Sequence, residues 1–160
     1  MQRVDREAFL QQLHAQFGLP QPVVADLARR ATGEEVVSVE RLVAGDEYEV
    51  YRVELVGSWV VYPRICVPGM PAGKAAWEAW AMGRARAGGV PVPEVLTVQD
   101  VADGDEKRGA MVVAAARGRQ LATILPALTP SRRSAVLADL GRVLGRLHAV
   151  PMPGHGRPDP

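Results

Sequence analysis

The stretch EYEVYRVEL at residues 47–55 determines the fold class, because hydrophobic and polar residues alternate along its whole length. Such alternation is typical of a β-strand with one buried face. The triplet VGS at 56–58 is a turn, WVVY at 59–62 resumes an extended run, and residues 37–42 form an earlier alternating run. These segments predict a three-stranded antiparallel meander. Pro63 lacks a backbone N–H, so we expect the third strand to be an edge strand or to carry a bulge there.

Helical patterns flank the meander on both sides. Before it, residues 5–17 carry apolar side chains at three- and four-residue spacing, and residues 22–32 continue this pattern up to Gly33. After it, residues 74–87 are rich in Ala, Trp, Glu, Met and Arg and are followed by Gly88. We therefore predict two helices before the meander and one after it.

A second hairpin and a last helix complete the pattern. Short apolar runs at residues 94–99 and 110–115 are separated by a polar segment, 100–108, which we expect to be a loop. Thr129 is a suitable N-cap, Pro130 suits the first helical position, and a stripe of Val and Leu follows. The sequence thus predicts an α+β fold: a five-stranded antiparallel sheet with one inserted helix, N-terminal helices and a C-terminal connecting helix.

Length and composition describe one globular domain. The chain has 160 residues, of which 48% are hydrophobic, so it can bury a core without disulfide or metal support. Its single cysteine, Cys66, excludes an internal disulfide and a multi-cysteine zinc site. No apolar run approaches the ~18 residues of a membrane span, and the charged N-terminus is unlike a signal peptide. We therefore expect a cytoplasmic protein with no membrane partner.

The near-neutral net charge of +1 hides an uneven distribution. Residues 1–60 carry six Arg against ten acidic residues, whereas residues 61–160 carry 13 basic residues against eight acidic ones. A basic half can bind phosphate groups, but no cluster has the density of a nucleic-acid-binding patch. We expect no nucleic-acid partner.

Six segments stand out along the chain: RLVAGDEYEVYRV (41–53), VVYPRI (60–65), WE (77–78) with GVPVPEV (89–95), MVVAAARGRQL (111–121), LGRVLGRLHA (140–149) and PMPGHG (151–156). In this order they resemble the N-terminal portion of aminoglycoside phosphotransferase-like small-molecule kinases, which contains the nucleotide-binding lobe. Each motif is weak alone, but six in one order are specific.

The resemblance covers about residues 25–156 and implies a division of the chain. Residues 1–33 form an N-terminal helical segment, and residues 34–116 form a protein-kinase-like small lobe. Residues 117–150 contain the hinge exit and the first helices of the large lobe. Residues 151–160 are expected to be a flexible tail, with the remainder of the large lobe absent.

The resemblance also implies an ATP site. Gly45 would let backbone N–H groups approach the phosphates, because a glycine turn leaves the backbone uncovered. Arg64 stands where the family usually has Lys, and its planar fork can hold two phosphate oxygens. Glu78 would orient Arg64 as an ion pair, while the backbone around Val113 and Ala115 would hold adenine. Each residue also has a purely structural reading: a hairpin glycine, a surface arginine, an exposed helical glutamate and an ordinary buried strand.

The family places its catalytic base and its Mg²⁺ ligands in the large lobe, and only ten residues follow position 150. The sequence contains no Asn. We therefore assign no catalytic and no metal-binding residue in this chain. The resemblance implies the ATP-binding portion of a phosphotransferase that, when complete, transfers the γ-phosphoryl of ATP to a hydroxyl of a small molecule such as an aminoglycoside.

This chain alone is expected to be inactive. A natural truncation, an incomplete sequence and half of a split enzyme all remain open. The alternative function is a non-catalytic interaction module derived from a kinase small lobe, which would self-associate or bind a complementary large lobe through the last helix.

Overall fold

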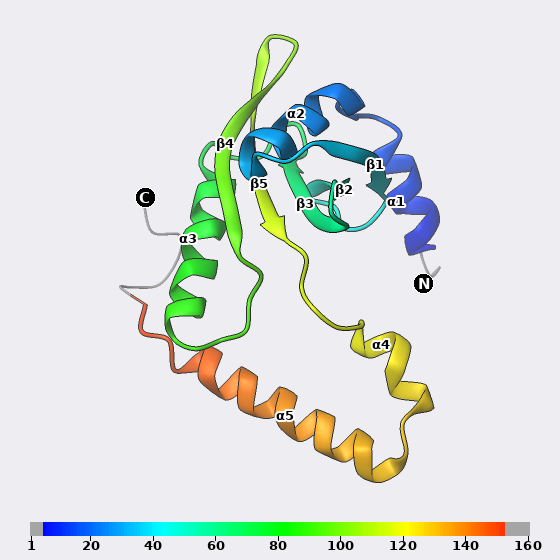
Figure 1. Ribbon diagram of the computed structural model, residues 1–160, viewed down its shortest axis with the longest axis vertical. Coiled ribbons are helices and arrows are strands. Elements are labelled where there is room, and N and C mark those ends of the chain that lie inside the picture. The colour runs from blue at the N-terminus through cyan, green and yellow to red at the C-terminus, as the bar shows by residue number, and fades with distance from the viewer. Residues whose placement is uncertain (1–4, 153–160) are drawn as a thin grey trace.

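The computed structural model describes residues 5–152, so the predicted tail lies outside the described residues from position 153 onward. Its elements follow the predicted order (Figure 1). They are α1 (Arg6–His14), α2 (Gln21–Thr32), β1 (Val36–Leu42), β2 (Tyr48–Leu55), β3 (Trp59–Cys66), α3 (Lys74–Ala87), β4 (Val95–Asp103), β5 (Glu106–Ala114), α4 (Leu121–Ile124), the 3₁₀ helix η1 (Leu125–Ala127) and α5 (Pro130–His148).

The five strands form one sheet in the order β1-β2-β3-β5-β4, and all neighbours are antiparallel. Helix α3 connects β3 to β4, as the sequence predicts. This confirms the predicted α+β fold, a kinase-like small lobe with N-terminal helices before the sheet and a connecting helix after it.

The alternation of side chains along the strands gives the sheet two buried faces. The face toward α2 carries the larger core, in which α2 contributes Val24 and Leu27 and the strands contribute Tyr51, Val53, Leu55, Val61, Ile65, Val101, Ala110 and Val112. The face toward α3 carries a smaller core of Tyr48, Cys66, Ala75, Met111 and Val113. The sheet is therefore covered by one helix on each face, and successive residues of β2 and β3 point to opposite cores.

The second hairpin is longer than the sequence predicts. Residues 100–108 are not a loop: β4 continues to Asp103, β5 begins at Glu106, and only a tight turn at Gly104 separates them. Although residues 100–108 are mostly polar, one face of this part of the hairpin is buried: Val101 is 4% exposed and Arg108 is 2% exposed. Their burial extends the ladder along the full length of both strands.

Pro63 does not mark an edge or a bulge, and that prediction is wrong. β3 is the central strand, and Pro63 pairs with Val112 of β5. The register between β2 and β3 is the same on both sides of Pro63, so no residue is inserted. The missing N–H is tolerated because the ladder between β2 and β3 has no pair at Pro63, between Val50↔Arg64 and Val53↔Val61, and the ring itself is buried.

A network of buried charges lies on the α2 side of the sheet. Arg108 of β5 donates from Nε to the Cys66 carbonyl (2.8 Å), from Nη1 to Asp103 (2.8 Å) and from Nη2 to Glu49. Glu49 of β2 is fully buried, and its carboxylate also accepts from the Leu19 N–H (3.2 Å). Burial lowers the pKa of Arg108, but the hydrogen bonds to Glu49 and Asp103 outweigh it, so the net pKa is raised. The network ties together β2, β4, β5 and the end of β3.

Tyr51 gives this network a pH dependence that can be measured. Its hydroxyl donates to Glu49 Oε2 (2.7 Å), and burial together with this hydrogen bond raises the pKa of Tyr51 to about 12. An unfolded tyrosine ionises near pH 10, so above about pH 10 the unfolded chain releases a proton that the native chain keeps. The stabilisation from the protonated phenol is therefore complete below about pH 10 and is lost as the pH rises towards about 12.

We expect the free energy of unfolding to fall above about pH 10, by at most about 1.4 kcal/mol per pH unit from this group. Urea unfolding of the wild type and of Tyr51→Phe, followed from about pH 9 upward, measures it. The Tyr51→Phe curve should be flatter, since phenylalanine cannot ionise. If the wild type and Tyr51→Phe showed the same pH dependence of the unfolding free energy, Tyr51 would have the same pKa in the folded and the unfolded chain.

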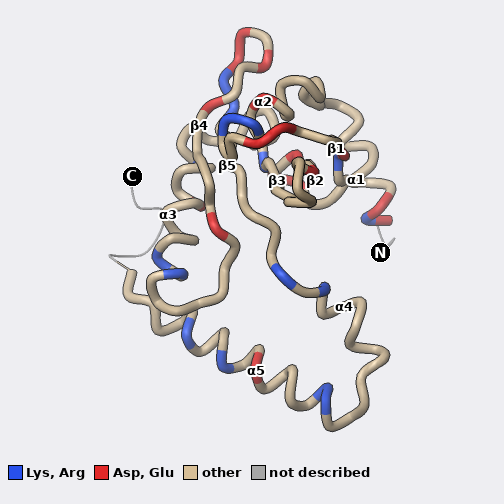
Figure 2. The backbone as a smooth tube through the Cα atoms, viewed as in Figure 1, with Lys and Arg blue, Asp and Glu red and all other residues tan. Residues whose placement is uncertain are grey.

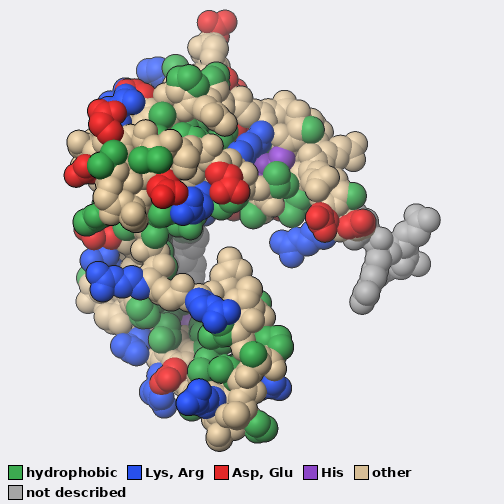
Figure 3. Space-filling model, turned by 45° about the vertical axis from the view of Figure 1, so that its right-hand side comes forward, with side chains coloured by type: hydrophobic (Ala, Val, Ile, Leu, Met, Phe, Trp, Pro, Cys, Tyr) green, Lys and Arg blue, Asp and Glu red, His purple; other side chains and the backbone are tan. Residues whose placement is uncertain are grey.

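The last helices form a limb that stands away from the sheet (Figure 1). The end of this limb is attached at the end of α3, where Arg146 donates to the Gly89 carbonyl (3.2 Å) and Arg84 to the Pro151 carbonyl (2.8 Å). The surface is hollowed between the sheet body and the limb (Figure 3). Four leucines of α5 are between 41% and 47% exposed: Leu137, Leu140, Leu144 and Leu147.

Charges are unevenly placed along the fold. Acidic residues gather at the turn of the β4–β5 hairpin, at Asp103, Asp105 and Glu106, whereas basic residues are spaced along α5 (Figure 2). Within residues 5–152, none of the helices combines the length and the apolar character needed to cross a membrane.

Candidate functional site

Arg64 of β3 lies on the α3 side of the sheet. It pairs with Val50 of β2 and Met111 of β5, so the strand register holds its backbone from both sides. Its Nη2 is 3.6 Å from Glu78 Oε2, and its guanidinium carbon is 4.4 Å from the centre of the Tyr48 ring. The side chain is 31% exposed. Arg64 is therefore oriented by a carboxylate and an aromatic face and still has donors open to solvent.

Lys74 is a second cation at this site, and it is almost fully buried. Its Nζ donates to Glu78 Oε1 (2.7 Å), one helical turn away on α3, and to Glu47 Oε2 (3.1 Å). Burial lowers the pKa of Lys74, but the bonds to Glu78 and Glu47 outweigh it, so the net pKa is raised and the ammonium is held charged. Lys74 thus holds one carboxylate oxygen of Glu78, Arg64 contacts the other, and Arg64 is the more accessible of the two cations.

The ring of Tyr48 lies against both Arg64 and Lys74. Its ring centre is 5.3 Å from Lys74 Nζ as well as 4.4 Å from the Arg64 guanidinium carbon, distances at which a cation is attracted to an aromatic face. Burial raises the pKa of the Tyr48 phenol, and the nearby Cys66 and Glu78 raise it further. The ring therefore stays neutral and acts as a platform for the cations.

The loop between β1 and β2, residues 43–47, contains Gly45 and is called the glycine loop below. Gly45 has φ +80°, a conformation that side-chain-bearing residues rarely adopt, and a Cβ there would meet nothing within 4 Å. The backbone at Gly45 is thus open to a ligand on the side where a Cβ would stand. Because Glu47 in this loop contacts Lys74, and Lys74 and Arg64 share Glu78, the loop is linked to the cation site through two carboxylates.

The segment that leaves β5 is the predicted adenine hinge. Val113 is buried on the α3 side, opposite Tyr62 of β3. Ala115 is exposed, and its N–H donates to the Val60 carbonyl (3.2 Å). That donor is used within the sheet, so an adenine ring would have to meet other backbone groups of the hinge. Adenine binding at Val113 and Ala115 stays a prediction.

The structure thus joins Arg64 to Glu78 in the ion pair that the sequence predicts. Lys74 and Tyr48 were not predicted from the sequence, although the four-residue spacing from Lys74 to Glu78 on one helix was a readable signal. Tyr48 could not be assigned from the pattern alone, because a buried strand aromatic is common. Among residues 5–152 there is no group of three or more His, Cys, Asp or Glu side chains that could hold a metal ion.

A five-stranded antiparallel sheet with a helix inserted after the third strand, carrying an Arg–Glu pair between that strand and that helix, is the small lobe of a kinase-like fold. A sequence profile of the phosphotransferase enzyme family matches residues 38–160. The chain belongs to this family.

The comparison with solved structures found a protein provisionally assigned as a fructosamine-3-kinase from Thermobifida fusca YX-ER1. It is 24% identical, with a TM-score of 0.45, and the match covers 61% of this chain and 32% of that chain. The chain therefore spans about a third of the length of that kinase. No curated protein shows significant similarity to the chain.

Proposed function

We propose that the lobe formed by β1 to β5 and α3 binds ATP for a small-molecule phosphotransferase. The observation that carries this proposal is the Arg64–Glu78 pair, which presents a partly exposed, oriented guanidinium on the α3 side of the sheet. Phosphoryl transfer depends chiefly on positioning and neutralising the phosphates, and an oriented Arg can hold two phosphate oxygens at once.

The other parts of the site support a nucleoside triphosphate. The glycine loop offers open backbone at Gly45 to the phosphates, and the small, exposed Ala115 after the buried Val113 leaves room for a flat ring beside the hinge backbone. Mg²⁺ is expected to arrive with ATP, bound to the phosphate oxygens, with its protein ligands outside the described residues. The complete enzyme would transfer the γ-phosphoryl to a hydroxyl of a small molecule such as an aminoglycoside.

Calorimetric titration of the wild-type chain with ATP and with AMP, each with Mg²⁺, tests this proposal. We expect ATP to bind at least about tenfold more tightly than AMP, because charge-assisted bonds to the outer phosphates contribute about 1.5–3 kcal/mol. A phosphorylation assay on hydroxylated small molecules should show no turnover by this chain alone. Equal affinity for ATP and AMP would contradict a phosphate role for Arg64.

A second candidate function, an interaction module, is favoured by the leucine stripe of α5. Leu137, Leu140, Leu144 and Leu147 are all more than two-fifths exposed, and such a patch favours association. In this account the stripe binds a second copy or a complementary large lobe. Size-exclusion chromatography of the wild type and of Leu140→Glu separates the outcomes, since a monomer in both cases would contradict self-association.

A further inference from the structure

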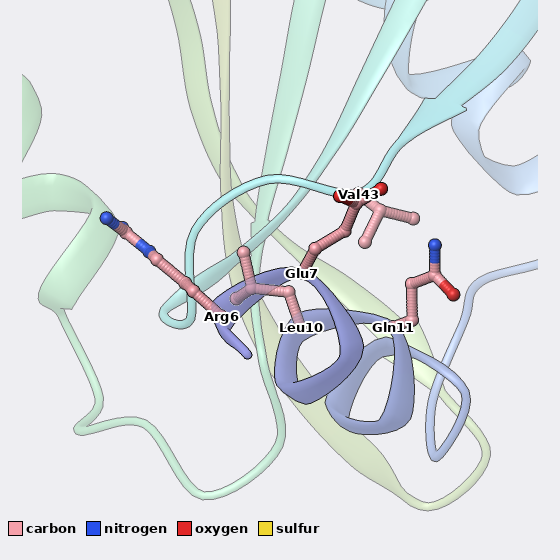
Figure 4. A pocket seen from close by; sticks show the side chains of 5 residues that line it. All are labelled: Arg6, Glu7, Leu10, Gln11 and Val43. Atoms are coloured by element: carbon pink, nitrogen blue, oxygen red, sulfur yellow. The ribbon is translucent and has the colours of Figure 1, made fainter. Parts of the chain in front are cut away.

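Helix α1 meets the sheet body at the glycine loop. Four of its residues, Arg6, Glu7, Leu10 and Gln11, line a cavity of about 310 Å³ whose other wall is Val43 of the loop (Figure 4). The last residue of α1, His14, is only 3% exposed although it is polar. Its burial requires that both ring nitrogens find partners.

Both ring nitrogens have polar partners, one a hydrogen-bond acceptor and the other a hydrogen-bond donor. Nε2 lies 2.8 Å from the Gly45 carbonyl oxygen, and Nδ1 lies 3.3 Å from Arg41 Nη2. A carbonyl can only accept and a guanidinium can only donate, so this geometry assigns the ring hydrogen to Nε2 and the acceptor role to Nδ1. His14 therefore donates to the glycine loop and accepts from β1.

Arg41 connects this contact to the rigid part of the fold. Its Nη2 is 3.6 Å from Glu49 Oε2, and Glu49 is bonded in turn to Arg108, which donates to the Cys66 carbonyl at the end of β3. A continuous polar chain thus runs from the Gly45 carbonyl to the end of the strand that carries Arg64. Lys74 anchors the other end of the loop through Glu47.

We propose that His14 is a positioning residue that sets the conformation of the glycine loop relative to Arg64. This rests on the proposed function in one respect, namely that the loop covers the phosphates of ATP. The hydrogen bond from Nε2 fixes the Gly45 carbonyl, and the Arg41–Glu49–Arg108 network fixes the ring. The binding-competent loop is therefore held before the nucleotide arrives, which reduces the ordering cost of binding.

Three variants separate the hydrogen bond from the packing. His14→Phe keeps a buried ring against Phe17 but has no nitrogen. His14→Gln keeps a side-chain amide that can donate to Gly45. Asp5→Ala removes the N-cap of α1, whose carboxylate accepts from the Glu7 and Ala8 N–H groups, and leaves His14 unchanged.

The first readout is the mobility of the loop backbone at residues 44–46, measured without nucleotide as NMR order parameters. We expect His14→Phe to lower these order parameters from about 0.85, the value of rigid backbone, towards about 0.6, with the central strands unaffected. His14→Gln should restore most of the rigidity, and Asp5→Ala should change it little. Wild-type order parameters in His14→Phe, or the same loss in Asp5→Ala, would overturn the proposal.

The second readout is the affinity for ATP with Mg²⁺, compared with that for adenosine. His14→Phe should weaken ATP binding about five- to tenfold and leave adenosine binding unchanged, and His14→Gln should recover ATP binding. An equal loss for adenosine would contradict a role at the phosphates. If the wild type binds no ATP, the proposed function fails, and the order parameters of the loop still decide whether His14 positions it.

Discussion

Replacing Arg108 by methionine is expected to lower the free energy of unfolding by about 3–5 kcal/mol, the usual cost of removing one partner from a buried ion pair. The variant removes the closer cation from Glu49, whose side chain is fully buried, and leaves it only the 3.6 Å contact with Arg41. It also removes the donors to Asp103 and to the Cys66 carbonyl. Equilibrium unfolding in urea measures the loss, provided that the slope with denaturant is unchanged.

A double variant tests whether the charge or the lost volume is responsible. Glu49→Gln combined with Arg108→Met removes both charges but keeps an amide oxygen that can accept from Leu19 and Tyr51. We expect this pair to be more stable than Arg108→Met alone. Arg52→Met is the matched control, because its pair with Glu54 is about a third exposed, and it should cost less than about 1 kcal/mol. Equal losses in the Arg108 and Arg52 variants would contradict the structural role of the network.

Replacing Arg64 by alanine is expected to weaken the binding of ATP with Mg²⁺ about 10- to 100-fold, because bonds to a charged partner contribute about 1.5–3 kcal/mol. The fold should change little, since the pair with Glu78 is partly exposed. Arg64→Lys should lie between the wild type and Arg64→Ala, because lysine keeps the charge but lacks the two-pronged geometry. Calorimetry gives the three dissociation constants directly.

The control for this series is Arg86→Ala on the same helix as Glu78. Arg86 is 55% exposed and pairs only loosely with Glu94, at 3.7 Å, so its loss should not alter ATP binding. Adenosine affinity should be the same in all variants, because adenosine carries no phosphate. A uniform loss of ATP and adenosine affinity in Arg64→Ala would point to damage to the cleft rather than to a lost phosphate contact.

The sheet and its inserted helix could be predicted because their signals are local: hydrophobic and polar residues alternate in residues 47–62, and glycines follow the helical patterns. The length of the β4–β5 hairpin could not, since the burial of Arg108 depends on Glu49, which is 59 residues earlier in the chain. Pro63 was misjudged for a related reason. Its ring is accepted in the central strand because tertiary packing outweighs one lost ladder donor.

The residues of the candidate site also divide into those with a local signal in the sequence and those that depend on tertiary contacts. Arg64 and Glu78 were predicted because the order of motifs locates one strand and one helix, and the structure brings them within 3.6 Å. Tyr48 and His14 were missed because each gains its role from contacts across elements, and Lys74 was missed although its spacing to Glu78 lies within one helix. His14 gave one weak sign: it follows Leu10 by four residues on the apolar side of the first helical pattern.

The proposed function requires ATP to bind between the glycine loop, Arg64 and α3, so its binding has to be located on the chain. Backbone amide NMR spectra of the isotopically labelled wild type, recorded during titration with ATP and Mg²⁺, give that location. We expect the saturable shifts to concentrate on the glycine loop, on β3 around Arg64, on the first half of α3 around Glu78, and on the hinge at Ala115. Shifts confined to α5 or to the β4–β5 hairpin, or no saturable shifts at all, would contradict the proposed function.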